Sequence, residues 1–516
     1  MNLDRLKLDR QVERLLAPFD GSGPGATIGV VLDGDLAIHR SAGMASVELG
    51  VPISARTRFR IASVSKQFTC AAVLKLAAEG RLSTTDDIRI YLPELPDFGP
   101  ISIDMIMRNM SGIRDMLEVQ RLGGMDLGMT CGIADLLAGI CRQTDTNFPP
   151  GERFLYSNSN FLLAGLIVER VSGLALPEYL ARHFFRPLGM NATLMTPLTR
   201  TLVPDLATGY MAGPVRATHG FELGGEGGLV SSVIDLALWD AALTTGAADR
   251  AGLTTQADFN NGVANQYARG LVVSHYRGVR TEDHGGLWPG FRTAFLRAPE
   301  QNATVIVIAN FATIDPAQLA FATLDAVLDG KPGVHPVPAM PNFTRLAGRY
   351  LDPSSPMTLD VVVADSGAIT VTPNGVPMSV KPTADGRLLA GKGPFALLLR
   401  PSEDALELEV SSGHIQNFHR VADNVPLPEG LDGVYACADM AAEWTIADDS
   451  VTVSGPLVCG QQWSLLGVEG DIIRVCIPGL LFQGWLDVRV MRDGEGAVSG
   501  LTANGGRAKR VIFRKL

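Results

Sequence analysis

A proline-rich stretch divides this chain into two parts with different sequence patterns. Residues 331–341 read Lys-Pro-Gly-Val-His-Pro-Val-Pro-Ala-Met-Pro, a composition typical of an extended, semi-rigid linker. Before the linker, helical and strand patterns are mixed. After it, short alternating segments are separated by Gly, Asp and Pro, which is typical of all-β structure. The sequence therefore predicts an α+β domain at 1–331, with β structure beyond it.

The part after the linker repeats itself. Leu-Ala-Gly-Arg-Tyr at 346–350 returns as Leu-Asp-Gly-Val-Tyr at 431–435, and Pro-Leu-Pro-Glu-Gly at 426–430 joins the two units. Closing a sheet into a barrel removes its exposed edges, so repeated short strands favour barrels. We predict two homologous antiparallel β-barrels of about eight strands each, at 343–424 and 430–516.

In the first domain, strands lie at both ends and helices lie between them. Ala26–Leu32 and Leu36–His39 flank an Asp-Gly turn, and the apolar run Val305–Ala309 is typical of a strand buried on both faces. The simplest assembly is one antiparallel sheet covered by helices, with a helical subdomain beside it and a ligand cleft between the two. Further strands are expected at 270–275 and 293–297, helices at 3–16, 63–78, 161–172 and 316–328, and capping boxes at Ser83–Asp86 and Ser232–Asp235.

Composition excludes several classes of function. The net charge is −10 and the pI ≈ 5.4, which does not fit a surface for nucleic acid or an anionic membrane, since both need basic patches. No apolar run is long enough for a membrane span, and the charged N-terminus lacks the apolar core of a secretory signal, so we expect a cytoplasmic protein. The six cysteines form no Cys-x-x-Cys pair and are expected to be reduced. No metal or phosphate motif is found, so we expect no cofactor.

The first candidate site is Ser63-Val64-Ser65-Lys66, at the start of a helical pattern. Residues three apart share a helix face, so Ser63 and Lys66 would point the same way from a first turn that favours negative charge. A hydroxyl becomes a nucleophile when a neighbour takes its proton, and a desolvated lysine amine can do so. Ser-x-x-Lys alone arises readily by chance, and the alternative is a helix cap beside a surface lysine.

Two further stretches offer polar groups. Tyr156 and Asn158 follow a Pro-Gly turn and precede an apolar helix; the alternative is that Asn158 or Ser159 caps this helix and Tyr156 packs. The second stretch is 283–290, Asp-His-Gly-Gly-Leu-Trp-Pro-Gly, whose glycines allow backbone or ligand to approach closely, as on a strand that forms one wall of a site. A backbone N–H there could meet the Ser63 N–H to form an oxyanion hole, the alternative being a loop histidine between Gly-rich turns.

Taken in order, these stretches resemble a known set of motifs. Ser-x-x-Lys, Ser-Asp-Asn and Lys-Thr-Gly mark class A β-lactamases and penicillin-binding proteins. Tyr-x-Asn and His-x-Gly are the variants in class C β-lactamases and their esterase and peptidase relatives. Ile103–Ile113 and Gly227–Ala237 resemble two supporting stretches of the same family. Residues 15–330 thus resemble the serine β-lactamase and penicillin-binding-protein superfamily.

The resemblance implies acyl transfer. Ser63 Oγ would attack a carbonyl carbon, and Lys66 and Tyr156 would take the hydroxyl proton and pass it to the leaving group, with either as the base. The N–H groups of Ser63 and Leu287 would bind the oxyanion, and water would release the acyl group. The expected catalytic residues are Ser63, Lys66, Tyr156 and His284, and the expected substrate-binding residues are Asn158, Gly286 and Leu287.

The domain layout is similar to the bacterial D-aminopeptidases of this superfamily. It implies a D-stereospecific aminopeptidase acting on short peptides, amides and esters, a homodimer, and inhibition by β-lactams. In those enzymes a loop of the last barrel enters the cleft, and by position it matches 476–485 here. This loop has no aspartate to pair with a substrate ammonium, and Asp487 reads as strand. The loop residues expected at the substrate are Pro478, Gly479, Leu480, Leu481, Phe482 and Gln483.

Other functions stay open at this point. The apolar loop favours an esterase, an amidase or a carboxypeptidase-like hydrolase of the same superfamily, and the absence of an export signal argues against a β-lactamase. A non-catalytic peptide- or penicillin-binding protein would keep the fold without the chemistry. The barrels could also be scaffolds or carbohydrate-binding units, but we expect removal of 430–516 to change specificity.

Overall fold

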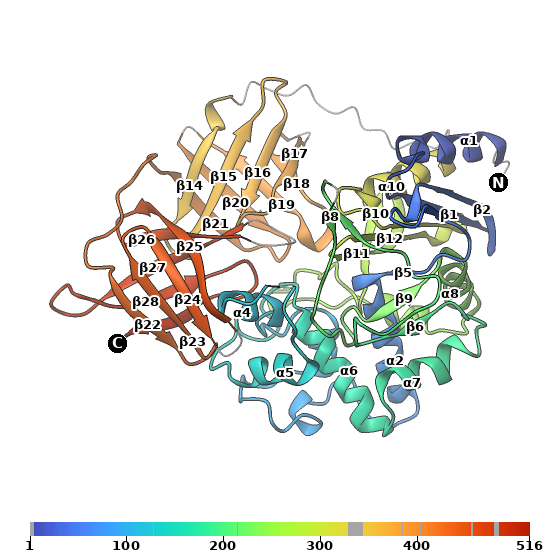
Figure 1. The fold of residues 1–516 in the computed structure, drawn as a ribbon, viewed down its shortest axis with the longest axis horizontal. Helices are drawn as coiled ribbons and strands as arrows, with labels where there is room; N and C mark the ends of the chain where they lie inside the picture. The colour runs from blue at the N-terminus through green and yellow to red at the C-terminus, as the bar shows by residue number, and fades with distance from the viewer. Residues whose placement is uncertain are drawn as a thin grey trace.

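The structure is a computed structural model that describes residues 5–126, 128–213, 215–328, 344–383, 385–402, 404–455, 458–478 and 484–516. Figure 1 shows an N-terminal domain of helices and strands on one side and two β-barrels on the other. The predicted linker at 331–341 lies outside the described residues.

A six-stranded antiparallel sheet forms the base of the first domain, in the order β10-β11-β12-β13-β1-β2. The first hairpin therefore pairs with the last strand of the domain, β13, as predicted. Helices α1 and α10 cover one face and α8 covers the other, so β13 is buried along its whole length. The bounds are α1 Arg5–Leu16, β1 Ala26–Leu32, β2 Asp35–Ala42, α8 Val233–Thr245, β10 Val272–Tyr276, β11 Val279–Trp288, β12 Phe291–Ala298, β13 Ala303–Ala309 and α10 Pro316–Val327.

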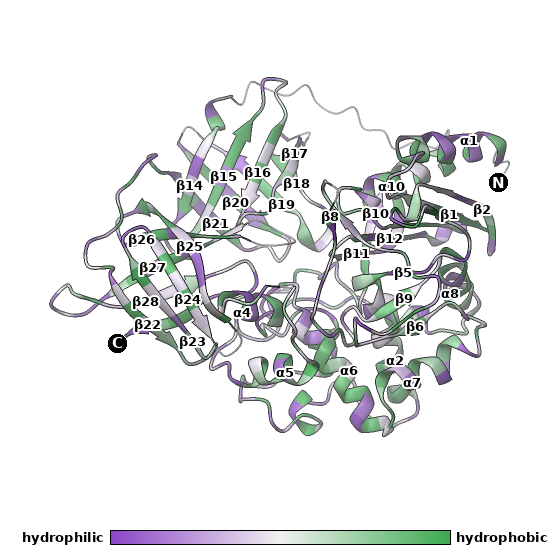
Figure 2. Cartoon of the chain, in the orientation of Figure 1, coloured by the Kyte–Doolittle hydropathy of each residue, from purple (hydrophilic) through white to green (hydrophobic). Residues whose placement is uncertain are grey.

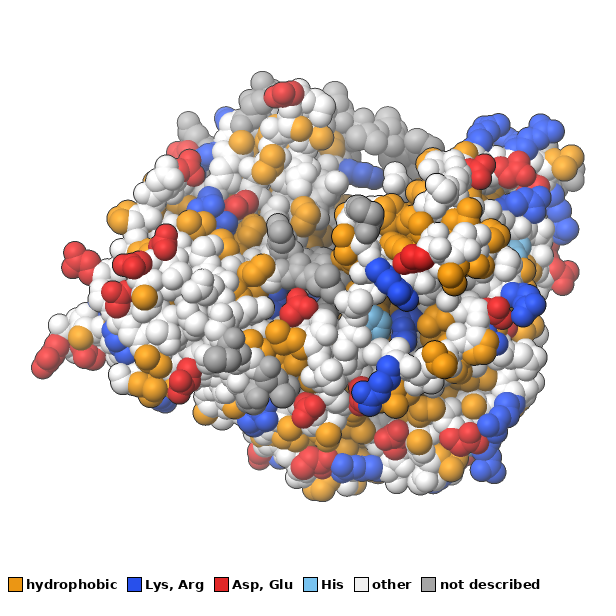
Figure 3. Space-filling model, in the orientation of Figure 1, with side chains coloured by type: hydrophobic (Ala, Val, Ile, Leu, Met, Phe, Trp, Pro, Cys, Tyr) orange, Lys and Arg blue, Asp and Glu red, His pale blue; other side chains and the backbone are white. Residues whose placement is uncertain are grey.

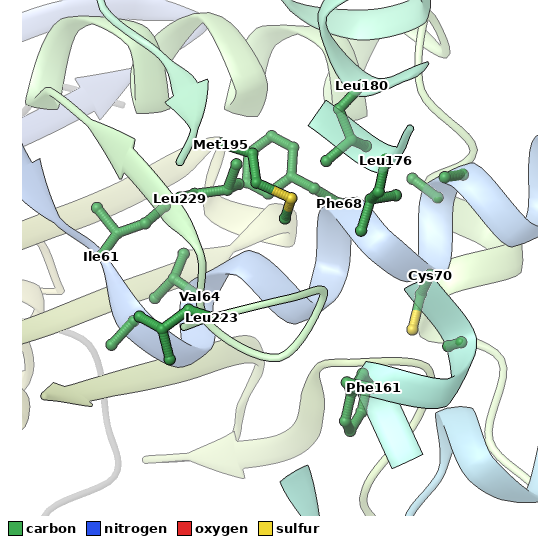
Figure 4. Close-up of a cluster of buried hydrophobic side chains, with 14 of the residues drawn as sticks. Ile61, Val64, Phe68, Cys70, Phe161, Leu176, Leu180, Met195, Leu223 and Leu229 are labelled. Atoms are coloured by element: carbon green, nitrogen blue, oxygen red, sulfur yellow. The ribbon is translucent and has the colours of Figure 1, made fainter. Parts of the chain in front are cut away.

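The helical subdomain packs around α2, which is buried on almost every side. Figure 4 shows Phe68 and Cys70 of α2 among apolar side chains from other elements, including Phe161, Leu176 and Met195. Helix α6 begins at Asn158 with Ser157 at its N-cap, so neither predicted cap residue holds that place. The helices here are α2 Lys66–Ala78, α3 Ile103–Met107, α4 Met116–Leu122, α5 Ile133–Cys141, α6 Asn158–Ser172, α7 Leu176–Leu180 and α9 Arg250–Thr254.

Short strands run through this region, which the sequence predicted to be mostly helical. β5, β9 and β6 form a three-stranded sheet beside the turn that holds Ser63, and two small two-stranded sheets lie elsewhere. Their bounds are β3 Met44–Ser46, β4 Val51–Pro52, β5 Phe59–Arg60, β6 Leu194–Met195, β7 Tyr210–Met211, β8 Val215–Arg216 and β9 Leu229–Ser231.

The two predicted capping boxes have different outcomes. Ser232 caps α8, since its Oγ accepts from Asp235 N at 3.2 Å. The prediction of a capping box at Ser83–Asp86 is wrong, because no helix starts at these residues. Asp86 Oδ2 accepts from Ser83 N at 2.7 Å within a turn, and the chain then bonds to the segment near Ile101. Pairing with another segment has replaced the local helix start.

Each barrel is a closed ring of eight antiparallel strands, as predicted. Figure 2 shows apolar and polar bands along the barrel strands, because alternate residues face the barrel core and the outside. The first barrel comprises β14 Gly348–Asp352, β15 Met357–Val363, β16 Ile369–Pro373, β17 Met378–Pro382, β18 Leu388–Ala390, β19 Leu397–Pro401, β20 Ala405–Val410 and β21 Ile415–Arg420. The second comprises β22 Gly433–Cys437, β23 Ala442–Ala447, β24 Ser450–Gly455, β25 Val458–Glu469, β26 Ile472–Ile477, β27 Gly484–Arg492, β28 Val498–Asn504 and β29 Val511–Lys515.

The sequence repeat has a structural cause. The Tyr350 hydroxyl donates to Leu346 O at 3.1 Å, and the Tyr435 hydroxyl donates to Leu431 O at 2.5 Å. The glycine between them has φ 144° in the first barrel and 145° in the second, a region that favours glycine. The repeated Leu-x-Gly-x-Tyr pattern therefore closes the start of each barrel in the same way.

The second barrel is docked on the first domain through α4. Val119 and Leu122 of this helix pack into the apolar core of the barrel, and the Trp444 indole N–H donates to Leu122 O at 3.2 Å. A buried ion pair joins Arg114 to Asp439 at 2.7 Å. Breaking a buried pair by removing one partner typically costs about 3–5 kcal/mol, so the barrel is a fixed part of the molecule.

None of the described helices alone is long and apolar enough to cross a membrane. Only α6 and the helical segment Leu176–Phe185 pass such a test as a pair, and they are bent by 76° relative to each other.

Candidate active site

Ser63 lies in a tight 3-10 turn that leads from β5 into α2. The turn covers Ala62–Ser65, and Lys66 is the first residue of the α-helix. Ala62 has a φ of 47°, which is strained for a residue with a side chain and is often found at functional sites. The predicted three-residue spacing therefore places Ser63 and Lys66 together, with a 3-10 turn in place of the first α-helical turn.

The Lys66 amine is at the centre of the site. Its Nζ is 3.0 Å from Ser63 Oγ, 2.9 Å from Asn158 Oδ1 and 2.7 Å from Glu226 O. Burial lowers the pKa of Lys66 to about 7, against the opposite effect of the Glu226 carboxyl. An uncharged amine has two N–H groups and one lone pair. It can therefore donate to Asn158 and Glu226 while it accepts the proton of Ser63.

Tyr156 lies beside this pair. Its hydroxyl is hydrogen-bonded to the Ser63 side chain, and Lys66 Nζ is 4.9 Å from the centre of its ring. Burial raises the pKa of Tyr156 above that of an ordinary phenol, although the bond to Ser63 opposes the shift. At neutral pH the phenol keeps its proton and part of the amine does not. Of the two candidate bases, this favours Lys66 as proton acceptor, with Tyr156 as the donor to a leaving group.

A chain of hydrogen bonds fixes Asn158. Its backbone N and its Nδ2 donate to Asp115 Oδ2 at 2.6 and 2.9 Å. The other oxygen of Asp115 caps α4 by accepting from Leu117 N and Glu118 N. Because its Nδ2 donates to Asp115, the side-chain amide of Asn158 presents its Oδ1 to Lys66. Asn158 thus orients the lysine.

Glu226 is buried in the floor of the site. Its Oε1 accepts from Gly224 N at 2.8 Å, while Oε2 has no partner in the described part of the chain. A Cβ built on Gly224 would meet both Glu226 Oε2, at 3.0 Å, and a methyl of Leu162, at 2.8 Å. Burial beside apolar groups raises the pKa of Glu226 to about 7. Glu226 and Lys66 act on each other, so protons are lost by the pair in coupled steps.

The pH dependence of acylation follows from the Lys66 amine. Its pKa is about 7, and acid converts the uncharged base into an ammonium that cannot accept the Ser63 proton. We expect kcat/KM for an uncharged nitrophenyl ester to rise with pH through about 7, and to be about 100-fold lower at pH 5 than on the plateau. The measurement is a pH profile at constant ionic strength.

Glu226→Gln is the control for this profile. The carboxyl of Glu226 raises the pKa of Lys66, so its replacement should move the rising limb to lower pH. A limb that stays in place, or moves to higher pH, would contradict the assignment of this titration to Lys66.

His284 lies on strand β11, where the sequence had left open a loop. Its Nε2 is 2.8 Å from the Tyr267 hydroxyl and its Nδ1 is 2.6 Å from Gly285 O. A carbonyl only accepts, so Nδ1 carries the hydrogen and Nε2 accepts from Tyr267. Burial lowers the pKa of His284 to about 3, and the Lys66 charge adds to this effect. The uncharged His284 ring packs beside Tyr156, and the two ring centres are 6.1 Å apart.

The free edge of β11 faces the Ser63 turn. Strand β10 pairs with β11 only as far as Asp283. Beyond that point β11 packs against the catalytic turn, and a Cβ on Gly286 would lie 2.3 Å from Ile61 O. Glycine is therefore required at 286 for this close approach. Leu287 is the next residue on this strand, and its N–H remains the predicted second donor of the oxyanion hole.

The predicted substrate loop of the second barrel is only partly described. Cys476 and Ile477 end β26, Pro478 is exposed, and Gly484 begins β27. Gly479, Leu480, Leu481, Phe482 and Gln483 lie outside the described residues, so their role stays a prediction.

Asp487 is engaged elsewhere, between the two barrels. Its carboxylate accepts from Thr358 N at 2.6 Å and from Thr358 Oγ1 at 2.7 Å, and Arg474 Nε is 3.8 Å away. Burial raises the pKa of Asp487 to about 6. This carboxylate holds the barrels together, as expected of a strand residue, and faces no substrate.

The first barrel adds an aromatic side chain to the site. The Phe395 ring lies 5.8 Å from the Tyr156 ring, and Lys392 forms an ion pair with Asp283 at 3.2 Å. A cavity of ≈ 210 Å³ lies between strands β11 and β12 and the segment of the first barrel that carries Lys392 and Phe395. His284 and Phe395 form part of its wall. The first barrel therefore contributes to the wall of the site.

Five groups at the site were not recognised in the sequence. Asp115 and Glu226 lie just outside the two stretches that resemble the family, Ile103–Ile113 and Gly227–Ala237. This closeness in sequence is the signal by which they could have been found. Tyr267, Phe395 and Arg507 carry no local pattern. Arg507 lies in the loop between β28 and β29, 5.0 Å from the centre of the Tyr156 ring. Within the described residues, no group of three His, Cys, Asp or Glu side chains could hold a metal ion.

Known proteins are similar to this chain over most of its length. A family model described as Beta-lactamase matches residues 8–328. A D-aminopeptidase of Brucella anthropi is 30% identical over 97% of this chain and 96% of the relative. A D-aminopeptidase of Cereibacter sphaeroides (strain ATCC 17029 / ATH 2.4.9) is 29% identical over 100% of both chains.

Solved structures share the fold. The octameric penicillin-binding protein homologue from Pyrococcus abyssi has a TM-score of 0.56 at 21% identity, covering 87% of this chain and 98% of its own. The D-amino acid amidase from Ochrobactrum anthropi SV3 has a TM-score of 0.51 at 23% identity, covering 63% of this chain and 96% of its own.

Proposed function

This chain belongs to the β-lactamase family and is a serine hydrolase, and we propose that it is a D-stereospecific aminopeptidase. Its substrates in this proposal are short peptides, amides and esters with an N-terminal D-residue. The support is similarity to relatives named D-aminopeptidase along nearly the whole chain, including both barrels.

The observation that carries the proposal is the position of the Lys66 amine, 3.0 Å from Ser63 Oγ. The uncharged amine takes the Ser63 proton as Oγ bonds to the substrate carbonyl carbon, and the oxyanion forms beside the edge of β11. The proton then passes through Tyr156 to the leaving nitrogen, whose bond to carbon breaks. Water hydrolyses the acyl-enzyme by the reverse proton path.

A panel of matched substrates tests the specificity. We expect D-alanine p-nitroanilide to be hydrolysed with a kcat/KM at least about 10² times that of the L-enantiomer or of N-acetyl-D-alanine p-nitroanilide, since a site built for a charged or polar group strongly rejects analogues that lack it. Equal rates for the free and the acetylated D-substrate would contradict an aminopeptidase while leaving the serine hydrolase intact.

An esterase or amidase is the second candidate, and the charges around the site favour it. Among the described acids near the site, Asp115 holds Asn158, Asp283 is paired with Lys392, Glu226 lies in an apolar floor, and Asp487 lies between the barrels. All four carboxylates are buried, which disfavours each of them as the partner of a substrate ammonium. Faster hydrolysis of the acetylated than of the free-amine substrate would select this function.

We extend the proposal to a cytoplasmic homodimer. The five cysteines whose side chains are described, Cys70, Cys131, Cys141, Cys437 and Cys476, are unpaired thiols, which supports a reducing compartment. Light scattering on the purified protein tests the dimer, and a mass corresponding to one chain would refute it.

A further inference from the structure

Arg507 brings a positive charge from the second barrel to the catalytic tyrosine. Its guanidinium carbon lies 5.0 Å from the centre of the Tyr156 ring. The side chain is half-buried, at the tip of the loop that joins β28 to β29. Its charge also acts on the site electrostatically, since it lowers the pKa of both Lys66 and Tyr156.

The loop that carries Arg507 is held by the backbone of the catalytic domain. Arg507 O accepts from Asp115 N and from Asn147 Nδ2, both at 3.0 Å. Lys509 N donates to Asn147 Oδ1 at 2.7 Å, and Arg114 donates to two carbonyls farther along the loop. Because Asp115 also holds Asn158, the loop and the catalytic lysine share one hydrogen-bonded frame. Arg507 is therefore positioned together with the catalytic residues.

The Arg507 guanidinium makes no hydrogen bond or ion pair within the described part of the chain. The nearby acid is Glu118, which lies beneath Gly505 of the same loop. Burial raises the pKa of Glu118, and the charges of Arg121 and Arg507 oppose this effect. Figure 3 shows Lys and Arg side chains near a histidine in the middle of this face, where the barrels meet the first domain. A guanidinium fork without a hydrogen-bonded anion favours a carboxylate ligand.

The distance between Arg507 and the reacting atoms determines which residue of a substrate would carry the bound carboxylate. Tyr156 is the proton donor to the leaving nitrogen, and Arg507 contacts the same ring. One residue of an extended chain spans about 3.5 Å, so a carboxylate on the residue that leaves would come within reach of Arg507. Resting on the aminopeptidase function above, we propose that Arg507 binds the free C-terminal carboxylate of the leaving residue, which makes D-Xaa-Xaa dipeptides the preferred substrate class.

A matched substrate pair isolates this contact. D-alanylglycine and D-alanylglycinamide differ only in a carboxylate and a carboxamide, and both release D-alanine. For the whole protein we expect kcat/KM to be at least about 10-fold higher for the dipeptide acid. Arg507→Met should lower kcat/KM for the acid by about 10–100-fold and change the amide by less than about threefold, in line with the strength of charge-assisted hydrogen bonds. Arg507→Lys keeps the charge and loses the fork, so its kcat/KM for the dipeptide acid should lie between those of the unchanged protein and Arg507→Met.

Arg514→Met is the control for loss of a positive charge. This arginine is exposed on β29, close in sequence to Arg507 but outside the site, and its replacement should leave the ratio of the two substrates unchanged.

Three outcomes overturn parts of the scheme separately. If Arg507→Met slows both substrates equally and shifts the pH profile, Arg507 only tunes Lys66 and Tyr156, and carboxylate binding is refuted. An unchanged acid-to-amide ratio in Arg507→Met likewise refutes it. If the intact protein hydrolyses nitrophenyl esters but releases D-alanine from neither substrate, the aminopeptidase function fails, and the inference fails with it.

Discussion

Replacing Ser63 by alanine is expected to lower kcat for any acyl substrate by a factor on the order of 10⁶, the cost of removing a serine nucleophile in a comparable site. The residual rate would come from substrate binding and oxyanion stabilisation alone. A second result should accompany the loss. An activated ester, or a β-lactam if one reacts, should add a covalent acyl mass to the natural protein and none to Ser63→Ala, as measured by intact-protein mass spectrometry.

Ser65→Ala is the matched control, since it makes the same change two positions along the same turn. The Ser65 hydroxyl accepts from Leu229 N at 3.2 Å. Its loss should cost about 1 kcal/mol of stability but keep the covalent labelling. Labelling that persists in Ser63→Ala and disappears in Ser65→Ala would reverse the assignment. Labelling of both variants would place the nucleophile elsewhere in the chain.

Replacing Lys66 by methionine is expected to lower the acylation rate by about 10³–10⁴-fold, the upper range for loss of a general base. Methionine keeps an unbranched side chain in a fully buried position and removes the amine whose lone pair accepts the Ser63 proton. The rising limb of the pH profile near 7 should disappear as well. The measurement is single-turnover acylation by a nitrophenyl ester, with thermal unfolding to show that the variant folds.

Tyr156→Phe separates the two candidate bases. If Lys66 accepts the proton and Tyr156 relays it, the phenylalanine variant should be less impaired toward nitrophenyl esters, whose leaving group needs no proton, than toward amides. It should also keep the pH limb near 7. A Tyr156→Phe variant that loses the limb, beside a Lys66→Met variant that keeps it, would make the tyrosine the base.

The parts of the site that the sequence predicted are those with local geometry. Ser63 and Lys66 are three residues apart on one turn, so their approach depends on little else. Tyr156 and Asn158 were recognised by their order relative to Ser63, and the structure places Asn158 Oδ1 2.9 Å from Lys66 Nζ. The six-stranded sheet and both barrels were predicted for a related reason, because alternating and continuous apolar patterns report burial directly.

The parts that the sequence did not predict depend on long-range contacts. Ser83 and Asp86 match a capping box, yet Ile88 N donates to Ile101 O at 2.9 Å, so pairing between segments decided that structure. The strand character of 284–288 comes from pairing with β12, since two adjacent glycines do not favour a strand. Arg507 lies 360 residues beyond its partner Asn147, and nothing near 507 in the sequence signals a catalytic contact.

The long sequence separation between Arg507 and Asn147 also affects the order in which the site is assembled during protein synthesis. Domains emerging from the ribosome generally fold in order from the N-terminus, so the Ser63 turn, α4 and α6 are synthesised long before the loop that bonds Asp115 N through Arg507 O. Until that loop docks, Asp115 N lacks this acceptor and Asn147 lacks both of its bonds to the loop. A nascent chain therefore holds Ser63 in a frame that lacks these hydrogen bonds until the second barrel has been synthesised.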